Sequence, residues 1–282
     1  IACTVATVSA MIQRLTGSFA SGAAYIANWF QKKVPIILTL QEGDSESYLR
    51  FKWFGLIDLS WRMALRRATR LTAISNYLLD RAQRLGYRGE SYLIPNGVDI
   101  NKFENPTSNP INPEDVTLIT TSRLVEKNGV GDLIEAMKFL PENIKLKILG
   151  AGQLERSLKL KADSLKLKDR IQFLGFVAQD KLPEHLHKAD IFIRPSLSEG
   201  QGISFIEAMA AGLPVIATAV GGIVDFLHDG ETGLFVEPKN PRLIAFQVQK
   251  LISDRVLRDK IVINAKRLVR EKYDWDLIAE DM

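Results

Sequence analysis

Short apolar runs alternate with amphipathic segments at regular intervals from position 116 to the end of the chain. The apolar runs predict buried strands, whereas the longer segments repeat apolar residues every three or four positions and predict helices. The expected strands are 116–121, 145–149, 171–175, 190–194 and 213–218, and the expected helices are 131–140, 154–167, 181–188, 203–211, 241–272 and 274–282. Strands that alternate with helices predict a mostly parallel, doubly wound sheet in an α/β domain.

Residues 1–95 carry fewer elements. They predict strands at 35–41, 71–75 and 91–95 and helices at 22–33, 48–69 and 77–86. A complete doubly wound domain takes five or six strands, so we expect this N-terminal Rossmann-like domain to be incomplete, as in a truncated chain. The Asn-Gly turn at 96–97 and the polar, proline-bearing stretch 101–113 indicate the boundary to the second domain.

Composition is that of an ordinary α/β protein. Of the 282 residues, 46% are hydrophobic, and no apolar run reaches the roughly 18 residues of a membrane-spanning helix. The single cysteine, Cys3, cannot form an internal disulfide, so we expect a reducing, cytoplasmic compartment. The net charge is +4 and the basic residues are dispersed. This balance gives no indication of a nucleic-acid partner and suits an anionic substrate or a membrane surface.

Residues 189–222 are the most informative stretch. A strand is followed by a loop with Gly200 and Gly202 and then by the helix 203–211. The first N–H groups of a helix lack backbone partners and carry partial positive charge, while glycines let the main chain come close to a ligand. This order of elements predicts an anion site. Gly221 and Gly222 are likewise interpreted as glycines that let the main chain come close to the ligand.

Two carboxylates bracket the loop, Glu199 before it and Glu207 inside the helix. A carboxylate one turn into the helix can accept two hydrogen bonds from a ribose diol, and one on the loop can reach hydroxyls of a sugar linked to the phosphates. This pattern favours a sugar nucleotide as the ligand. The alternative is that Glu199 is a solvated loop residue and Glu207 an exposed helix residue.

The run from Glu199 to Ala217 resembles the E-x7-E signature of family 4 retaining glycosyltransferases, which have the GT-B fold, and the likeness extends from about residue 35 to the C-terminus. The resemblance implies two Rossmann-like domains facing a cleft: 1–95 on the acceptor side and 96–265 binding the donor, with 266–282 crossing back. It also implies that Glu199 contacts the donor sugar and Glu207 the ribose. The diphosphate is then held by the loop residues Gly200, Gln201, Gly202, Ile203 and Ser204.

The loop 121–129 follows the first strand of the second domain, so Arg123 and Lys127 are expected at the same sheet edge as the glycine loop. Two cations there can neutralise a departing diphosphate, and the resemblance assigns an arginine and a lysine of this loop to that role. Arg123 matches the family pattern. The usual lysine aligns with Asn128, and Lys127 is expected to substitute for it. The alternative is a surface loop with two solvated cations.

Gly150 and Gly152 follow a strand and resemble the start of a dinucleotide fingerprint, but Glu155 stands where a third glycine is needed. The family resemblance instead assigns Gly150 to the donor crevice and Phe176 and Val177 to the neighbourhood of the base. No cluster of Cys and His suggests zinc, and we expect neither a metal nor another cofactor.

One departure from the family lies on the acceptor side, where Gln41 stands in place of a histidine that many relatives carry. Glutamine can donate and accept hydrogen bonds but cannot shuttle protons at neutral pH. The helix 48–69 mixes Trp53, Phe54 and Trp61 with arginines and a lysine. It is interpreted either as a helix with its apolar face in the core or as a contact with an anionic membrane.

We therefore expect a retaining glycosyltransferase that moves a hexose or related sugar from a nucleotide-diphosphate-sugar donor to a hydroxyl of a glycan, lipid-linked or small-molecule acceptor. The expected localisation is cytoplasmic, and the alternative is peripheral binding to the inner face of the membrane. Two alternatives remain: a GT-B sugar-nucleotide epimerase or phosphorylase, and a non-catalytic subunit or fragment that only binds the nucleotide sugar.

Overall fold

The computed structural model describes residues 35–46, 56–104 and 111–280. The chain divides into two compact units, Ile1–Pro95 and Asn96–Met282. The helix expected at 22–33 and the first part of the helix expected at 48–69, with Trp53 and Phe54, lie outside the described residues.

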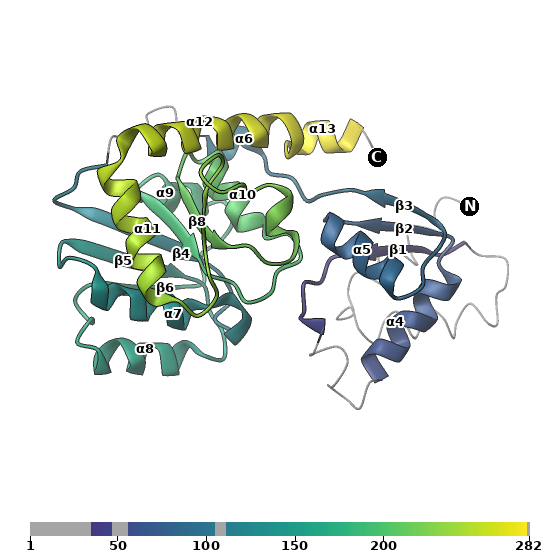
Figure 1. Ribbon diagram of the computed structural model, residues 1–282, viewed down its shortest axis with the longest axis horizontal. Helices are drawn as coiled ribbons and strands as arrows, with labels where there is room; N and C mark the ends of the chain where they lie inside the picture. Colours follow the sequence, from purple (N-terminus) through teal and green to yellow (C-terminus); the bar gives the residue numbers. More distant parts are fainter. Residues whose placement is uncertain (1–34, 47–55, 105–110, 281–282) are drawn as a thin grey trace. The chain divides into compact units, whose positions relative to one another are not determined.

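The second unit contains a six-stranded parallel sheet with the strand order β6-β5-β4-β7-β8-β9 (Figure 1). Its strands are β4 (Val116–Thr121), β5 (Ile144–Leu149), β6 (Ile171–Gly175), β7 (Ile191–Arg194), β8 (Val215–Thr218) and β9 (Leu234–Val236). This is the order of a doubly wound sheet, and it confirms the expected α/β class. The short strand β9 was not among the five expected from the sequence.

Helices cover both faces of this sheet. One face packs against α7 (Val130–Ala136), α8 (Glu155–Ser164) and α11 (Pro241–Ser253), and the other against α6 (Ile100–Phe103), α9 (Leu182–Leu186) and α10 (Ile203–Ala210). The long helix α12 (Arg255–Lys272) contributes to both cores, through Ile261 to the first and Val269 to the second. Successive side chains of a strand point to opposite faces, so Leu118 of β4 belongs to the first core cluster and Ile119 to the second. Burial on both faces explains why these strands are continuous apolar runs in the sequence.

Two expectations about the ends of this unit are corrected. The continuous helix expected over 241–272 is wrong, because Asp254 ends α11 and its carboxylate accepts a hydrogen bond at 2.9 Å from Leu257 N in the first turn of α12. The stretch 101–113 is not wholly a linker, because Phe103 of α6 is buried in the core of the second unit. The part of α12 beyond residue 265 also packs in that core, through Val269.

The first unit has a three-stranded parallel sheet in the order β1-β2-β3, formed by Ile37–Leu40, Arg70–Ala73 and Glu90–Leu93. Its helices are α4 (Leu56–Arg67) and α5 (Asn76–Arg84), whose apolar sides form a core with β1 and β2. Trp61 of α4 lies in this core, whereas Arg66 and Arg67 are exposed. Within the described part of the helix, Trp61 therefore fits the interpretation as a core helix.

The cap at Asp254 gives a test of the helix break. Replacing Asp254 by Ala removes the acceptor for Leu257 N and should lower the free energy of unfolding by about 1 kcal/mol in a urea titration, whereas Asp254→Asn should retain most of it. Equal stability of the wild type and both variants would contradict the assignment of Asp254 as the cap.

Candidate functional site at the carboxyl ends of β4 and β7

The strand order of the second unit reverses between β4 and β7. These two strands pair in parallel with Leu118 opposite Ile191, while the chain continues from β4 to β5 on one side and from β7 to β8 on the other. Ligands of open parallel sheets bind outside the carboxyl ends of the strands at such a reversal. The loops that begin after Thr121 and Arg194 lie at this point, and they contain Arg123 and Glu199.

Glycines let the loop after β7 pack closely against the start of α10 and against the loop after β8. Gly202 has a φ of 88° and begins α10; a Cβ there would lie 2.5 Å from a ring carbon of Phe205. At Gly221 a Cβ would lie 1.8 Å from the carbonyl oxygen of Glu199, and Gly222 N donates to the same oxygen at 3.2 Å. The close approach at Gly221 is therefore to the chain's own backbone.

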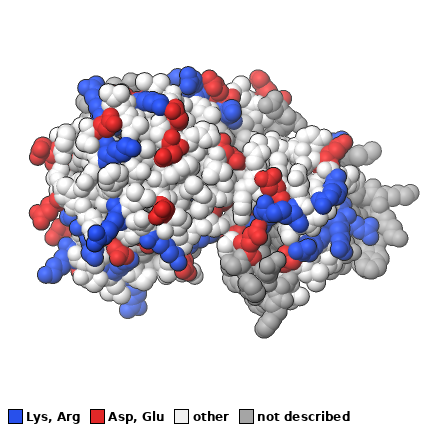
Figure 2. All heavy atoms as spheres, in the orientation of Figure 1, with Lys and Arg blue, Asp and Glu red and all other residues white. Residues whose placement is uncertain are grey.

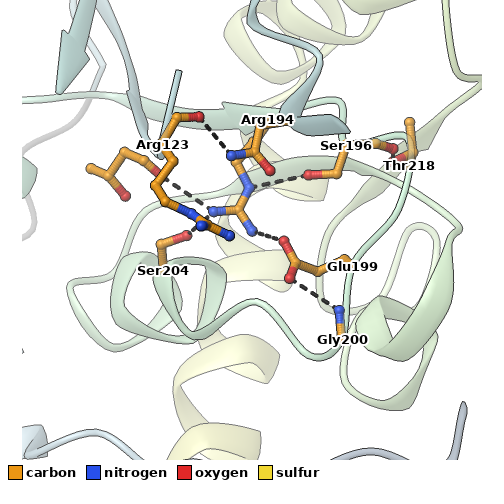
Figure 3. A network of polar contacts seen from close by, with 9 residues as sticks. Arg123, Arg194, Ser196, Glu199, Gly200, Ser204 and Thr218 are labelled. Carbon is orange, nitrogen blue, oxygen red and sulfur yellow. Dashed lines mark hydrogen bonds and ion pairs between the residues drawn. The ribbon is translucent and has the colours of Figure 1, made fainter. Parts of the chain in front are cut away.

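The centre of the site is Arg194, which no sequence pattern singled out. Its guanidinium donates to Ser196 Oγ at 3.2 Å, to the carbonyl oxygen of Thr121 at 3.2 Å and to Ser204 Oγ at 2.7 Å. It also forms an ion pair and hydrogen bond with Glu199 (Figure 3). One side chain at the end of β7 thus joins the end of β4, the loop after β7 and the first turn of α10.

The electrostatics of Arg194 show which charges converge. Burial lowers the pKa of the Arg194 guanidinium, Glu199 and Glu207 raise it, and Arg123 lowers it. Figure 3 shows the Arg123 side chain beside that of Arg194, and Glu199 pairs with Arg194 directly, so these three charges lie together at the end of β7. The expected grouping of Arg123, Glu199 and Glu207 at one edge of the sheet agrees with this geometry.

Glu207 is buried, with 5% of its surface exposed, so the alternative of an exposed helix residue does not hold. Its Oε1 accepts a hydrogen bond at 2.5 Å from Nε2 of Gln179, which lies in the loop after β6. Burial raises the pKa of the Glu207 carboxyl, opposed by the Gln179 hydrogen bond and by Arg194. Gln179 could not be found from local pattern, because it meets Glu207 from 28 positions away.

Gln201 holds the glycine loop to the first residue of the second unit. Its side chain is 2% exposed, and Oε1 accepts from Asn96 N at 2.8 Å while Nε2 donates to Asn96 O at 3.0 Å. Of the three remaining loop residues with a predicted role, Gly200 donates its N–H to Glu199 Oε1 at 3.1 Å, Ser204 is buried with its hydroxyl against Arg194, and Ile203 is half-buried against the core. The side chain of Gln201 therefore has a structural contact, which leaves only its main chain for the predicted role in donor binding.

The loop after β4 carries the two predicted cations. Arg123 is exposed, and its carbonyl oxygen accepts a hydrogen bond at 2.7 Å from Nδ2 of the buried Asn128. Lys127 is half-buried, and its carbonyl oxygen accepts from Leu197 N at 2.6 Å. This contact fixes the loop after β4 to the loop after β7.

The remaining predicted donor residues follow β5 and β6. Gly150 N donates to Gly175 O at 2.6 Å, and a Cβ at Gly150 would lie 1.8 Å from Ser122 O, so close packing of the loop after β4 requires a glycine here. Phe176 is 82% exposed, whereas Val177 is half-buried against the core. Gln41, the predicted acceptor-side residue, belongs to the first unit and is exposed.

A cavity of about 640 Å³ lies at the other end of the sheet. Asp190 and Pro214, at the amino ends of β7 and β8, line it together with residues of α12 such as Arg258 and Lys266. It contains none of the predicted site residues. We assign the site to the carboxyl ends of the strands, because the charged side chains and the start of α10 meet there.

Within the described ranges, no group of three or more His, Cys, Asp or Glu side chains is arranged to hold a metal ion. The described helices likewise include none that is long and apolar enough to cross a membrane.

Comparison with known families gives two matches. The family model described as Glycosyl transferases group 1 matches residues 101–268, and the one described as Glycosyltransferase Family 4 matches residues 15–102. The larger match contains all the predicted donor-site residues of the second unit.

Two curated relatives share part of their length with this chain. An uncharacterized glycosyltransferase of Methanocaldococcus jannaschii is 38% identical over 173 residues. The GDP-mannose-dependent alpha-(1-6)-phosphatidylinositol monomannoside mannosyltransferase of Mycobacterium tuberculosis is 30% identical over 227 residues. The matches cover 61% and 74% of this chain but only 44% and 59% of those relatives, so the chain spans about half of their length.

Two solved structures show the fold. HepE of Anabaena, in complex with UDP and glucose, has a TM-score of 0.81 at 23% identity, with 94% of this chain and 74% of that chain covered. The C-terminal domain of a group 1 glycosyl transferase, LpcC, from Francisella tularensis has a TM-score of 0.57 at 30% identity, with 64% of this chain and 100% of that chain covered. These likenesses confirm the predicted GT-B fold.

The contact between Gln201 and Asn96 is open to a direct test. Gln201→Met removes both hydrogen bonds to the half-buried main chain of Asn96 and should lower the free energy of unfolding by about 1–3 kcal/mol in urea titrations. Gln249→Met, at an exposed position of α11, is the matched control and should change it by less than about 0.5 kcal/mol. An equal change in the free energy of unfolding for both substitutions would exclude a stabilising role of the Gln201–Asn96 hydrogen bonds.

Proposed function

This chain belongs to the group 1 glycosyl transferases, and on that premise we propose that it transfers a hexose or related sugar from a nucleotide-diphosphate sugar to a hydroxyl of an acceptor. The observation that carries the proposal is that Arg123 and Glu199 meet at the buried Arg194 guanidinium at the strand reversal, where α10 with Glu207 begins. Cations, main-chain amides at a helix start and two carboxylates are the groups that a sugar-bearing diphosphate requires.

The donor occupies the carboxyl ends of β4 and β7 in this proposal. Glu207 accepts hydrogen bonds from the ribose diol, and Glu199 from hydroxyls of the donor sugar. The amides from Gly200 to Ser204 hold the diphosphate, with the loop of Gly150 beside them and Phe176 and Val177 near the base. Arg123 and Lys127 stabilise the negative charge that develops on the departing diphosphate, an electrostatic role that provides much of the rate acceleration in group transfer.

The proposed transfer retains the anomeric configuration. The acceptor hydroxyl oxygen forms its bond to the anomeric carbon on the face from which the diphosphate leaves, and the bond from that carbon to the phosphate oxygen breaks. The hydroxyl proton passes to the leaving diphosphate, so the reaction needs no separate enzymic base, and in this proposal Arg123 and Lys127 neutralise the leaving group in place of a metal. Gln41, which cannot act as a proton shuttle at neutral pH, is compatible with this route on the acceptor side.

The relatives suggest which donors to test. One of them is named for GDP-mannose, and the structure of HepE contains UDP and glucose. The same relative acts on a phosphatidylinositol monomannoside, which supports a lipid-linked or glycan acceptor for this chain. Exposed Arg66 and Arg67 on α4 and the neighbouring Arg70 would suit the anionic inner face of a membrane. Across the face of the second unit seen in Figure 2, acidic and basic groups are interspersed, so the proposal places no membrane contact there.

A thermal-shift panel tests the proposal. UDP, GDP and ADP and their hexose conjugates should include at least one ligand that raises the melting temperature, because a ligand that binds only the native state stabilises it. Glu207→Ala should abolish that shift. Glu135→Ala, which removes an ion pair of α7 with Lys161, should leave it unchanged. No shift of the wild type with any member of the panel would refute the proposed donor site.

The proposal predicts a specific pH dependence. Accepting two hydrogen bonds from a diol requires ionised Glu207, so nucleotide affinity should fall as the pH drops through the raised pKa of this carboxyl, above its ordinary 4.5. Gln179→Met removes a hydrogen bond to the ionised form, raises that pKa further and should move the midpoint of the loss to higher pH. The midpoints come from titrations of nucleotide binding at a series of pH values, and coinciding midpoints would contradict the role of Glu207.

Product analysis tests the stereochemistry and the alternatives. With an α-linked donor such as GDP-mannose or UDP-glucose, the product should carry an α linkage in the NMR spectrum of its anomeric proton; a β linkage would exclude retention. An epimerised nucleotide sugar formed without acceptor, or a sugar phosphate formed with inorganic phosphate, would instead identify an epimerase or a phosphorylase.

A further inference from the structure

Arg194 is an unusual residue for its position. It ends β7, whose preceding residues Ile191, Phe192 and Ile193 are completely buried, and it is itself only 6% exposed. Its guanidinium lies over the ring of Phe205 at 4.3 Å from the centroid. Taking an arginine out of water is costly, and an apolar residue often serves as well where stability alone matters. What distinguishes Arg194 from other buried arginines is that its partners lie at the end of β4, in the loop after β7 and at the start of α10, which points to a task beyond packing.

We infer that Arg194 is a positioning residue of the donor site: it holds the carboxylate of Glu199 in the orientation that binds the donor sugar. The inference rests on the proposed function and extends it to a residue to which neither the sequence pattern nor the family resemblance gives a role. Arg194 is enclosed by protein groups and acts through Glu199, so it is not assigned a contact with the substrate.

The hydrogen bonds of Arg194 fix Glu199 in one orientation. Oε2 of Glu199 faces the Arg194 guanidinium, and Oε1 accepts from Gly200 N at 3.1 Å. The same guanidinium reaches Thr121 O at the end of β4, so the orientation of Glu199 is set relative to the loop of Arg123. A planar guanidinium with several donors can hold these partners at once, which a lysine cannot do.

Two parts of the donor should respond differently when this arrangement is lost. In the proposed site, the loop amides, Arg123 and Glu207 bind the nucleoside diphosphate. Glu207 is held by a hydrogen bond from Gln179, a partner other than Arg194. The sugar depends on Glu199, whose orientation comes from Arg194. Loss of Arg194 should therefore reduce the preference for the sugar-bearing nucleotide over the bare diphosphate, rather than weaken both equally.

The experiment measures dissociation constants of UDP and UDP-glucose, and of GDP and GDP-mannose, by calorimetry. The readout is the ratio of the constant for the diphosphate to that for its sugar conjugate. Arg194→Met should reduce this ratio by about tenfold or more, as expected when a hydrogen bond to a charged group is lost, and Arg194→Lys should restore part of it. Arg258→Met is the matched control: Arg258 is also 6% exposed, but it donates to Leu251 O and Ile252 O at the end of α11. This control should lower the melting temperature and leave the ratio unchanged.

An unchanged ratio in folded Arg194→Met would overturn the inference while leaving the proposed donor site intact. If Arg194→Met does not fold, the comparison is made in a Glu199→Gln variant. In that variant residue 199 is neutral, so removal of Arg194 leaves no carboxylate at this position without its ion-pair partner. There the further substitution Arg194→Met should leave the already reduced ratio unchanged, and an additional tenfold loss would contradict action through Glu199. Failure of the wild type to bind any member of the thermal-shift panel, the adenosine ligands included, would refute the proposed function and this inference with it.

Discussion

The parallel pairing of β4 with β7 is the constraint on which the site depends. The pairing brings together the carboxyl ends of two strands that are far apart in the sequence, with Ile119 opposite Phe192, while the chain leaves them toward opposite edges of the sheet. Ligands of such sheets bind beside the loops that follow the two strands at this reversal. Glycines then allow these loops to touch, since a Cβ at Gly129 would lie 1.9 Å from Pro195 O.

Electrostatics explain why charged groups remain at the end of an apolar sheet. Arg194 is buried at the cost of its hydration, and Glu199, Ser204 and a main-chain carbonyl replace the lost water. Arg123 adds a second positive charge close enough to lower the pKa of Arg194. A bound diphosphate would relieve this repulsion between like charges. Preorganised cations of this kind stabilise developing negative charge without further rearrangement.

Local pattern predicted most of the second unit because its elements obey simple periodicities. β4 and β6 begin and end where the apolar runs predict, and the span from Glu199 to Glu207 has the predicted order of loop and helix. Arg194 was missed because it stands at the end of an apolar strand with no local sign of a partner. The hydrogen-bond partners of Gln179 and Gln201 could not be predicted from local pattern, because Gln179 meets Glu207 across 28 positions and Gln201 meets Asn96 across 105. Such contacts exist only after folding. The break at Asp254 was missed because helical periodicity continues across it.

Hydrogen exchange in the presence of a sugar nucleotide tests the central claim most directly. With saturating UDP-glucose or GDP-mannose, the account predicts slower exchange of the main-chain amides from Gly200 to Ser204, which it assigns to the diphosphate. Unchanged exchange there, together with protection of residues 211–214 and 255–266 around the cavity at the opposite end of the sheet, would contradict it.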